Sequence, residues 1–324
     1  MLLDSLWVLI GFALLILGAD FMVRGSVTVA RRFGISPLVI GVTVVALGTS
    51  LPELMVCLRA AFEGAPGITV GNLVGSNIAN TLLILGVAAV ILPVRCGPQA
   101  LNRDGMAMLA GTAVFMAFGL MFGFTRLYGL IGISLLVGYL YYSYRSDLAS
   151  GEDAHTQEAD EIGAVKGGLP VVLLVTAGGL VGVIIGAEFL VHGSVSLARD
   201  LGVSEEVIGL TLVAFGTSVP ELATTIVAAV RKQSDVALGN VLGSNLFNLL
   251  GIMGATALVI EVPMPPKIAG FDIWVMGFVT VLLLVFMRTS GRIGRREGAA
   301  FLILYVAFLA AQTTDISMVS AAAG

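Results

Sequence analysis

The 324-residue sequence is poor in charge, cysteine and histidine, and each shortage excludes a class of protein. Charged residues make up 12% of the chain, against about 25% in soluble domains. A net charge of -4 provides no basic surface for nucleic acid. Cys57 and Cys96 cannot build a disulfide framework, and His155 and His192 cannot form a zinc site or a catalytic dyad. We therefore expect no enzyme, no prosthetic group, no nucleic-acid partner and no protein partner.

Hydrophobic residues take the place of the missing polar ones, at 57% of the chain with a mean hydropathy of +1.01. Apolar stretches of about 18 residues or more recur along the whole length, and the period-two alternation of barrel strands is absent. The sequence therefore predicts an all-α membrane protein whose first span is retained. Ten transmembrane helices are expected, at roughly 4–30, 36–62, 67–93, 104–123, 125–144, 168–198, 205–230, 235–260, 270–288 and 297–313.

The two halves of the chain are copies of each other. Placing residue n on residue n+168 gives 34 identities over the 69 positions from Gly18 to Gly86, which align with Gly186 to Gly254. The predicted organisation is a first five-helix repeat at 1–145 with its motif at 46–86, a solvated acidic linker at 146–167 that includes Asp147, and a second five-helix repeat at 168–324 with its motif at 214–254. Five helices per repeat is an odd number, so the second repeat should have inverted topology.

The distribution of positive charge agrees with an inverted repeat. Cytoplasmic loops of membrane proteins carry an excess of Lys and Arg. With the N-terminus outside, twelve of the 17 Lys and Arg residues fall inside and four fall outside, while Arg24 lies within a span. We therefore expect the N-terminus and the C-terminus outside and the linker in the cytoplasm.

One polar motif interrupts the second apolar span of each repeat: ALGTSLPEL at 46–54 and AFGTSVPEL at 214–222. Each motif places one glutamate, Glu53 or Glu221, at membrane depth, where an ionisable side chain is costly and usually functional. Glycine and proline around each acid are expected to break the helix and to free backbone carbonyl oxygens, including that of Ala46.

Hydroxyl and amide oxygens repeat around the two acids at helical spacing, which places them on shared helix faces. The candidate ion ligands are Glu53, Glu221, Thr49, Ser50, Thr217, Ser218, Ser76, Ser244, Asn80, Asn248 and the carbonyls of Ala46 and Ala214. The remaining amides of the third and eighth spans are interpreted as caps of broken helices or bridges between them, with ion binding as the alternative: Asn72, Asn77, Asn240 and Asn245. The glycines of the same spans, Gly71, Gly75, Gly239 and Gly243, are interpreted as helix-packing residues.

A second pair of acids, Asp20 and Glu188, is also duplicated. Each has a basic residue four positions later, Arg24 or His192, on the same helix face. We interpret both as mainly structural pairs on the first and sixth spans.

The ligand set contains two carboxylates and many neutral oxygens but no sulfur or imidazole, which favours a hard cation. Calcium binds about six to eight oxygens, so it fits this set best. Sodium could use the same oxygens in several smaller groups. We therefore expect Ca²⁺ and Na⁺ as the bound ions.

The paired motifs GTSLPEL with GNLVGSN and GTSVPEL with GNVLGSN resemble the two alpha-repeats of the sodium/calcium exchanger family, within the cation/calcium antiporters. The short linker resembles that of prokaryotic members, which implies a location in the prokaryotic cell (inner) membrane with the lipid bilayer as surroundings. The resemblance further implies two inverted five-helix repeats, with helices 2, 3, 7 and 8 forming the site and helices 1 and 6 gating it. It implies that Glu53 and Glu221 bind both Ca²⁺ and Na⁺ as transported ions.

The expected function is a secondary active antiporter that exchanges Na⁺ for Ca²⁺ across the membrane by alternating access. A calcium/cation antiporter coupled to H⁺ or K⁺ is the alternative, and a cation channel is a weaker one. By the same resemblance, some family members, including potassium-dependent ones, have an aspartate at the position that matches Asn248. This chain has one acid fewer there, which disfavours K⁺ coupling. The GNxxE pattern typical of the proton-coupled branch is replaced by GTSxPE, which disfavours H⁺ coupling.

Overall fold

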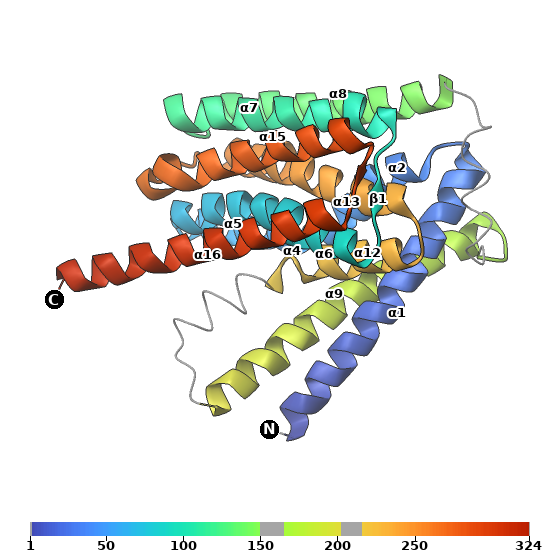
Figure 1. The fold of residues 1–324 in the computed structure, drawn as a ribbon, viewed down its shortest axis with the longest axis horizontal. Helices are drawn as coiled ribbons and strands as arrows, with labels where there is room; N and C mark the ends of the chain where they lie inside the picture. Colours follow the sequence, from blue (N-terminus) through green and yellow to red (C-terminus); the bar gives the residue numbers. More distant parts are fainter. Residues whose placement is uncertain (1, 150–164, 202–215, 324) are drawn as a thin grey trace.

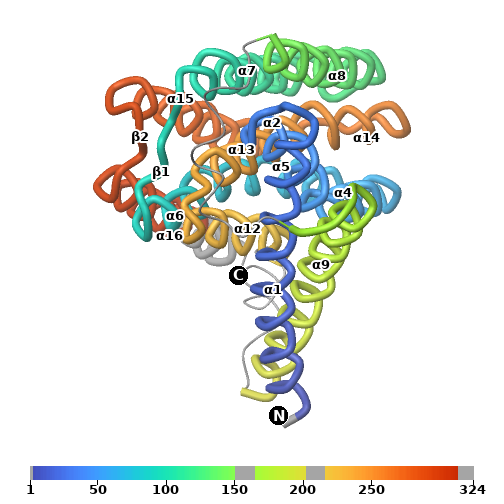
Figure 2. The backbone as a smooth tube through the Cα atoms, turned by 90° about the vertical axis from the view of Figure 1, so that its right-hand side faces the viewer, coloured from blue at the N-terminus to red at the C-terminus, as the bar shows by residue number. Residues whose placement is uncertain are grey.

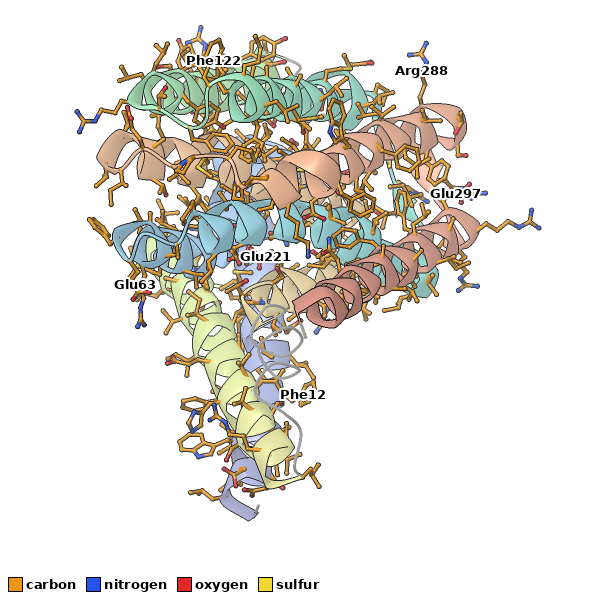
Figure 3. The ribbon with its side chains drawn as sticks, turned by 90° about the vertical axis from the view of Figure 1, so that its left-hand side faces the viewer. Phe12, Glu63, Phe122, Glu221, Arg288 and Glu297 are labelled. Atoms are coloured by element: carbon orange, nitrogen blue, oxygen red, sulfur yellow. The ribbon has the colours of Figure 1, made fainter. Side chains whose placement is uncertain are left out.

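The computed structural model describes residues 2–149, 165–201 and 216–323, and these ranges are almost entirely helical. Seven helical segments there are long and apolar enough to cross a membrane, or eight if one bent pair counts as a span. Large apolar side chains cover the outside, with Phe12 51% and Phe122 65% exposed (Figure 3). Such a surface suits lipid and not water. The prediction of an all-α membrane protein is therefore confirmed.

The elements of the first half are α1 (Leu2–Phe33), α2 (Pro37–Ile40), η1 (Gly41–Val45), α3 (Ala46–Thr49), α4 (Leu51–Phe62), α5 (Pro66–Ala79), η2 (Asn80–Ile84), α6 (Leu85–Ile91), β1 (Val94–Arg95), η3 (Ala100–Gly105), α7 (Met106–Met121) and α8 (Arg126–Ala149). Those of the second half are α9 (Leu169–Asp200), α12 (Val219–Val230), α13 (Ser234–Leu246), η6 (Phe247–Ile252), α14 (Met253–Val259), η7 (Ile268–Asp272), α15 (Ile273–Ser290), β2 (Arg292–Ile293) and α16 (Arg295–Ala323). The η segments are π-helical turns.

The 168-residue offset of the sequence repeat also relates the helices, since α4 and α12 match at both ends, as do α6 and α14. Two short backbone pairings join the halves at matching places. β1 pairs with β2 through Val94 and Ile293, and an isolated bridge joins Phe124 to Val262, the counterpart of Val94. The 168-residue offset therefore relates the two pairings: Val94 corresponds to Val262, and Phe124 corresponds to position 292, one residue from Ile293.

Helices α1 and α9 lie side by side and project from the rest of the molecule (Figures 1 and 2). Glycines spaced by seven residues line both helices: Gly11, Gly18 and Gly25 on α1, and Gly179, Gly186 and Gly193 on α9. A Cβ on Gly18 would lie 2.8 Å from the carbonyl oxygen of Gly179, and one on Gly11 2.8 Å from that of Gly186. The two helices are therefore antiparallel and pack backbone against backbone, as small residues permit in membrane proteins.

The predicted pair of Asp20 and Arg24 is present at 3.7 Å, but Asp20 makes a shorter contact of 2.6 Å with Arg231, at the end of α12. This ion pair connects α1 to the helix that carries Glu221. The pairing predicted for Glu188 and His192 is wrong within the described residues, because no ion pair joins them. The His192 ring instead packs edge-on against Trp7, with centroids 6.4 Å apart.

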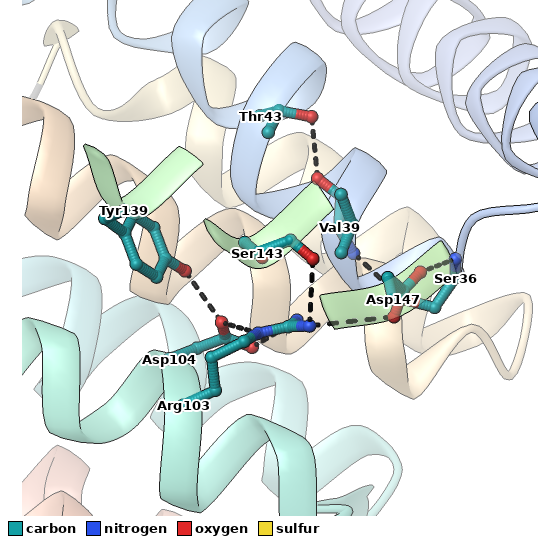
Figure 4. A network of polar contacts seen from close by, with 8 residues as sticks. All are labelled: Ser36, Val39, Thr43, Arg103, Asp104, Tyr139, Ser143 and Asp147. Carbon is teal, nitrogen blue, oxygen red and sulfur yellow. Dashed lines mark hydrogen bonds and ion pairs between the residues drawn. The ribbon is translucent and has the colours of Figure 1, made fainter. Parts of the chain in front are cut away.

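Asp147 corrects the predicted start of the linker. It was assigned to the solvated segment, but α8 continues to Ala149 and leaves Asp147 only 4% exposed. Its carboxylate accepts hydrogen bonds from the backbone and the hydroxyl of Ser36, and it lies 3.6 Å from the Arg103 guanidinium. Arg103 also forks onto Asp104, which accepts the Tyr139 hydroxyl at 2.8 Å (Figure 4). Burial is tolerated because each charge is paired, and the network joins the start of α2 and the end of η3 to the second half of α8.

The glycine contacts between α1 and α9 predict unequal effects for two adjacent substitutions. Gly179→Leu should lower the melting temperature of the purified protein, since overpacking typically costs about 1–3 kcal/mol and a Cβ there would meet the backbone nitrogen of Met22 at 2.5 Å. Gly178→Leu is the control, because no described atom lies within 4 Å of its Cβ position. Equal melting temperatures for both variants would contradict this packing.

Candidate functional site

The duplicated acids lie at the starts of two helices, α4 and α12, in the interior. In the first half, the helical segment that carries Glu53 bends by 46° between α3 and α4. The break falls at Ser50, with φ -87° and ψ 7°, and its counterpart Ser218 has φ -90° and ψ 2°. Glu53 and Glu221 follow in the first turns of α4 and α12, where the backbone N–H groups favour negative charge. The predicted helix break next to Glu53 is confirmed, whereas the segment that would precede the break next to Glu221 lies outside the described residues.

The two acids are buried together and are bound crosswise. Glu53 is 0% exposed and Glu221 is 1% exposed, and Figure 3 shows Glu221 inside the helical body. Ser50 Oγ donates to Glu221 Oε1 at 3.0 Å, and Ser218 Oγ donates to Glu53 Oε1 at 3.5 Å. The carboxylates are close enough to interact electrostatically. Each half therefore supplies a hydroxyl to the acid of the other half.

The third helix of each half adds further groups to this cluster. Ser76 Oγ lies 3.4 Å from Ser218 Oγ and accepts a hydrogen bond from Asn248 Nδ2 at 3.1 Å. Asn80 Nδ2 donates to Asn245 Oδ1, also at 3.1 Å. The π-helical turns η2 and η6 include Asn80 and Asn248, and such turns are frequent at functional sites. The sequence pattern gave no sign of them, because one wider turn barely changes the helical period.

Six oxygens of the cluster are buried without a hydrogen-bond partner in the described part of the chain. They are Glu53 Oε2, Glu221 Oε2, Asn80 Oδ1, Asn248 Oδ1, Thr217 Oγ1 and Ser244 Oγ. An unsatisfied buried polar atom costs about 1–3 kcal/mol, and more if it is charged. Because the amide nitrogens of Asn80 and Asn248 donate elsewhere, their oxygens stay available to a cation. Among the described residues no group of three or more His, Cys, Asp or Glu side chains forms a metal site, so neutral oxygens must complete any ion shell here.

The Ala46 carbonyl is not free, contrary to the prediction. It accepts the Ser50 backbone N–H at 3.0 Å, and the Thr49 hydroxyl oxygen lies 3.3 Å from it. The reason is that α3 closes its last turn onto Ala46 before the chain bends, so the bend does not release this carbonyl from its helical hydrogen bond. Thr49 itself is fully buried next to the cluster.

In the second half, the hydroxyl oxygen of Thr217 is buried directly before the Ser218 break. Ala214 lies outside the described residues. The bridging role predicted for the other asparagines is confirmed for Asn240 and Asn245, which bond across helices. The two counterparts stay within their own half: Asn77 Nδ2 donates to the Leu73 carbonyl and Asn72 Nδ2 to Cys57 Sγ.

The glycine prediction is confirmed for α13. A Cβ on Gly239 would lie 2.6 Å from the Leu38 carbonyl oxygen, and one on Gly243 would lie 2.5 Å from that of Val42. Gly71 and Gly75 of α5 have no such close neighbour among the described residues. The segment that matches Leu38 and Val42 in the other half is part of 202–215, which the structure does not describe.

Comparisons with known proteins agree with these features. A family model described as "Sodium/calcium exchanger protein" matches residues 4–146 and again residues 171–314. The sodium/calcium exchanger MaX1 of Methanosarcina acetivorans is 33% identical over 94% of this chain and 97% of its own. The Ca(2+)/H(+) antiporter ChaA of Bacillus subtilis is 27% identical over 89% and 86%. A solved structure of the sodium-calcium exchanger NCX_Mj, soaked with Na⁺ and Sr²⁺, superposes with a TM-score of 0.83 at 34% identity, covering 95% and 98%.

The unpaired oxygens predict that calcium stabilises the purified protein. At a calcium concentration one hundred times the dissociation constant, binding adds about 2.7 kcal/mol to the free energy of unfolding. Thermal unfolding in detergent should therefore shift upward with calcium, and Glu53→Gln or Glu221→Gln should remove most of the shift. Glu63→Gln is the matched control, since Glu63 is an exposed acid paired with Arg59 just beyond the end of α4. A full calcium shift in either site variant would show that the ion binds elsewhere.

Proposed function

Because the chain belongs to the sodium/calcium exchanger family, we propose that it is a secondary active antiporter that exchanges Na⁺ for Ca²⁺ across the membrane by alternating access. The observation that carries the proposal is the crosswise pairing of Glu53 and Glu221 with serines of the opposite half. A site shared in this way changes whenever the halves move relative to each other. That property is what a carrier with one site and two access states requires.

We assign the ion-binding role to side chains that meet in the buried cluster. Glu53 and Glu221 bind both Ca²⁺ and Na⁺ and supply the negative charge. The neutral ligands in this proposal are Thr49, Ser50, Thr217, Ser218, Ser76, Ser244, Asn80 and Asn248. The support is their burial and the six oxygens that lack a hydrogen-bond partner among the described residues.

The cost of an empty site explains why such a protein exchanges ions. A charged side chain at the bilayer centre costs about 2.5–3.5 kcal/mol on insertion scales, and this site holds two. The ion-free carrier is therefore disfavoured, and release of Ca²⁺ is coupled to binding of Na⁺. With three Na⁺ for one Ca²⁺, the ratio that the family resemblance implies, one net charge crosses per cycle. Transport would then respond to voltage by about 2.3 kcal/mol per 100 mV.

The proposed architecture is ten transmembrane helices in two inverted five-helix repeats, with both termini outside and the linker inside a prokaryotic cell membrane. Three features support the inversion: the common helix bounds, the antiparallel packing of α1 and α9, and the reciprocal backbone pairings of the halves. In this arrangement α1 and α9 are helices 1 and 6 and gate the site.

Proton coupling is the second candidate, since one relative is named as a Ca(2+)/H(+) antiporter. Two buried carboxylates could carry protons in place of Na⁺. The rival mechanisms differ in which gradient drives calcium uptake, so a transport measurement separates them.

Calcium uptake into proteoliposomes loaded with Na⁺, K⁺ or acidic buffer provides this measurement. An outward Na⁺ gradient should drive uptake of radioactive calcium, while K⁺ or pH gradients alone should not. Glu53→Gln and Glu221→Gln should abolish the flux and yet yield folded protein, with Glu63→Gln as the control. Uptake that follows the pH gradient would establish proton coupling instead, and a steady current without counter-ion would indicate a channel.

Asn248→Asp should change which monovalent ions support calcium flux, because it adds a third acid to a site that now presents an amide. The dependence of uptake on Na⁺ and K⁺ concentration measures this change. Asn102→Asp adds the same charge at an exposed position of η3 and serves as the control. An ion profile identical to that of the unmodified protein would place the Asn248 side chain outside the ion shell.

A further inference from the structure

We infer that Asn240 is a positioning residue that directs the Thr49 hydroxyl oxygen toward the transported ion, an inference that rests on the proposed function. Asn240 lies on α13 and is completely buried. It is not among the proposed ion ligands. It contacts groups from both halves, so its amide connects the broken helix of the first half to the acid of the second.

The hydrogen bonds of Asn240 determine how its amide is oriented. Its Nδ2 donates to Thr225 Oγ1 at 2.9 Å and to the backbone carbonyl of Glu221 at 3.3 Å. With the nitrogen on that side, Oδ1 faces Thr49 Oγ1 at 3.2 Å. An amide oxygen only accepts, so Thr49 must provide the proton in this contact.

The direction of the Thr49 proton matters for ion binding. A second acceptor near this hydroxyl is the Ala46 carbonyl at 3.3 Å, and the single proton of Thr49 is donated to one acceptor at a time. Thr49 is a close neighbour of the Glu221 carboxylate as well. If Asn240 did not accept the proton, the hydroxyl could donate to that carboxylate and would turn its hydrogen toward the ion site. Asn240 therefore keeps a lone pair of Thr49 available, as groups behind a metal ligand commonly do.

The matching residue of the first half lacks this arrangement. Asn72 is partly exposed, and its Nδ2 donates to Cys57 Sγ at 3.5 Å, where the second half has Thr225. Sulfur is a weak acceptor. Within the described residues no hydrogen bond joins Asn72 to Thr217, the counterpart of Thr49. The chain thus contains its own comparison: two asparagines in equivalent positions, of which one contacts a proposed ligand.

The test is a double-mutant cycle of Asn240→Ala and Thr49→Val. Radioactive calcium uptake into Na⁺-loaded proteoliposomes provides the half-saturating calcium concentration and the maximal rate, and the calcium-induced thermal shift provides binding at equilibrium. Loss of one oriented hydrogen bond should raise the half-saturating concentration about 3- to 10-fold in Asn240→Ala, with less than about a twofold change in maximal rate. In the Thr49→Val background the same substitution should add less than about twofold, since its target is already gone.

Asn72→Ala is the matched control and should change the half-saturating concentration less than about twofold. Equal effects of the two asparagine variants, additive effects in the cycle, or a lower maximal rate at unchanged calcium dependence would overturn the inference. If Asn240→Ala does not fold, Thr225→Val decides, since it removes an acceptor of the Asn240 amide and keeps the side-chain shape. It should shift calcium dependence in the same direction, and no shift would overturn the inference. Absence of Na⁺-driven uptake in the unmodified protein would refute the proposed function instead, while the thermal-shift cycle would still test the role of Asn240.

Discussion

Two carboxylates without a basic partner, buried in a protein that spans a membrane, are the constraint on which the structure depends. In the described residues no Lys, Arg or His contacts Glu53 or Glu221. One serine of the opposite half bonds each acid, and the second oxygen of each carboxylate has no donor. Charge buried in this way needs compensation, which a bound cation or proton can provide. The helix break at Ser50, the π-helical turns and the amide orientations all place oxygen atoms around these two carboxylates.

A second group of buried charges, around Arg103, consists of acids that are paired with a basic residue. Arg103 pairs with both Asp104 and Asp147, and the Tyr139 hydroxyl completes the network. A network with paired charges holds helix ends in place, because removal of one member would leave the others unsatisfied. The cluster around Glu53 and Glu221 is the reverse, since no basic residue among the described ones pairs with either acid. In the proposed function, paired charges stabilise the scaffold, and the unpaired acids attract an ion that can leave.

Duplication links architecture to function, because neither half contains a complete site. Ser50 serves the acid of the second half and Ser218 that of the first, so a displacement between the halves alters both acids together. The same reciprocity appears in the backbone pairings far from the site. Helices α1 and α9 pack on each other through glycine, and the pair of Asp20 and Arg231 ties them to α12. These contacts connect the helix that carries Glu221 to the two projecting helices.

The sequence alone determined the membrane class, the 168-residue repeat, the helix break next to Glu53 and the burial of two acids among hydroxyl and amide groups. These follow from local rules: hydropathy, the effect of Gly and Pro on helices, and spacing on one helix face. Only the tertiary structure decided that the Ala46 carbonyl is occupied, that Asp147 is buried and not solvated, and that Asn240 bridges the halves while Asn72 does not. Such outcomes depend on which helix lies opposite, and helical periodicity identifies the face of a helix but not its neighbour. The equivalent residues Asn72 and Asn240 therefore make different contacts, because the residues packed around them differ between the two halves.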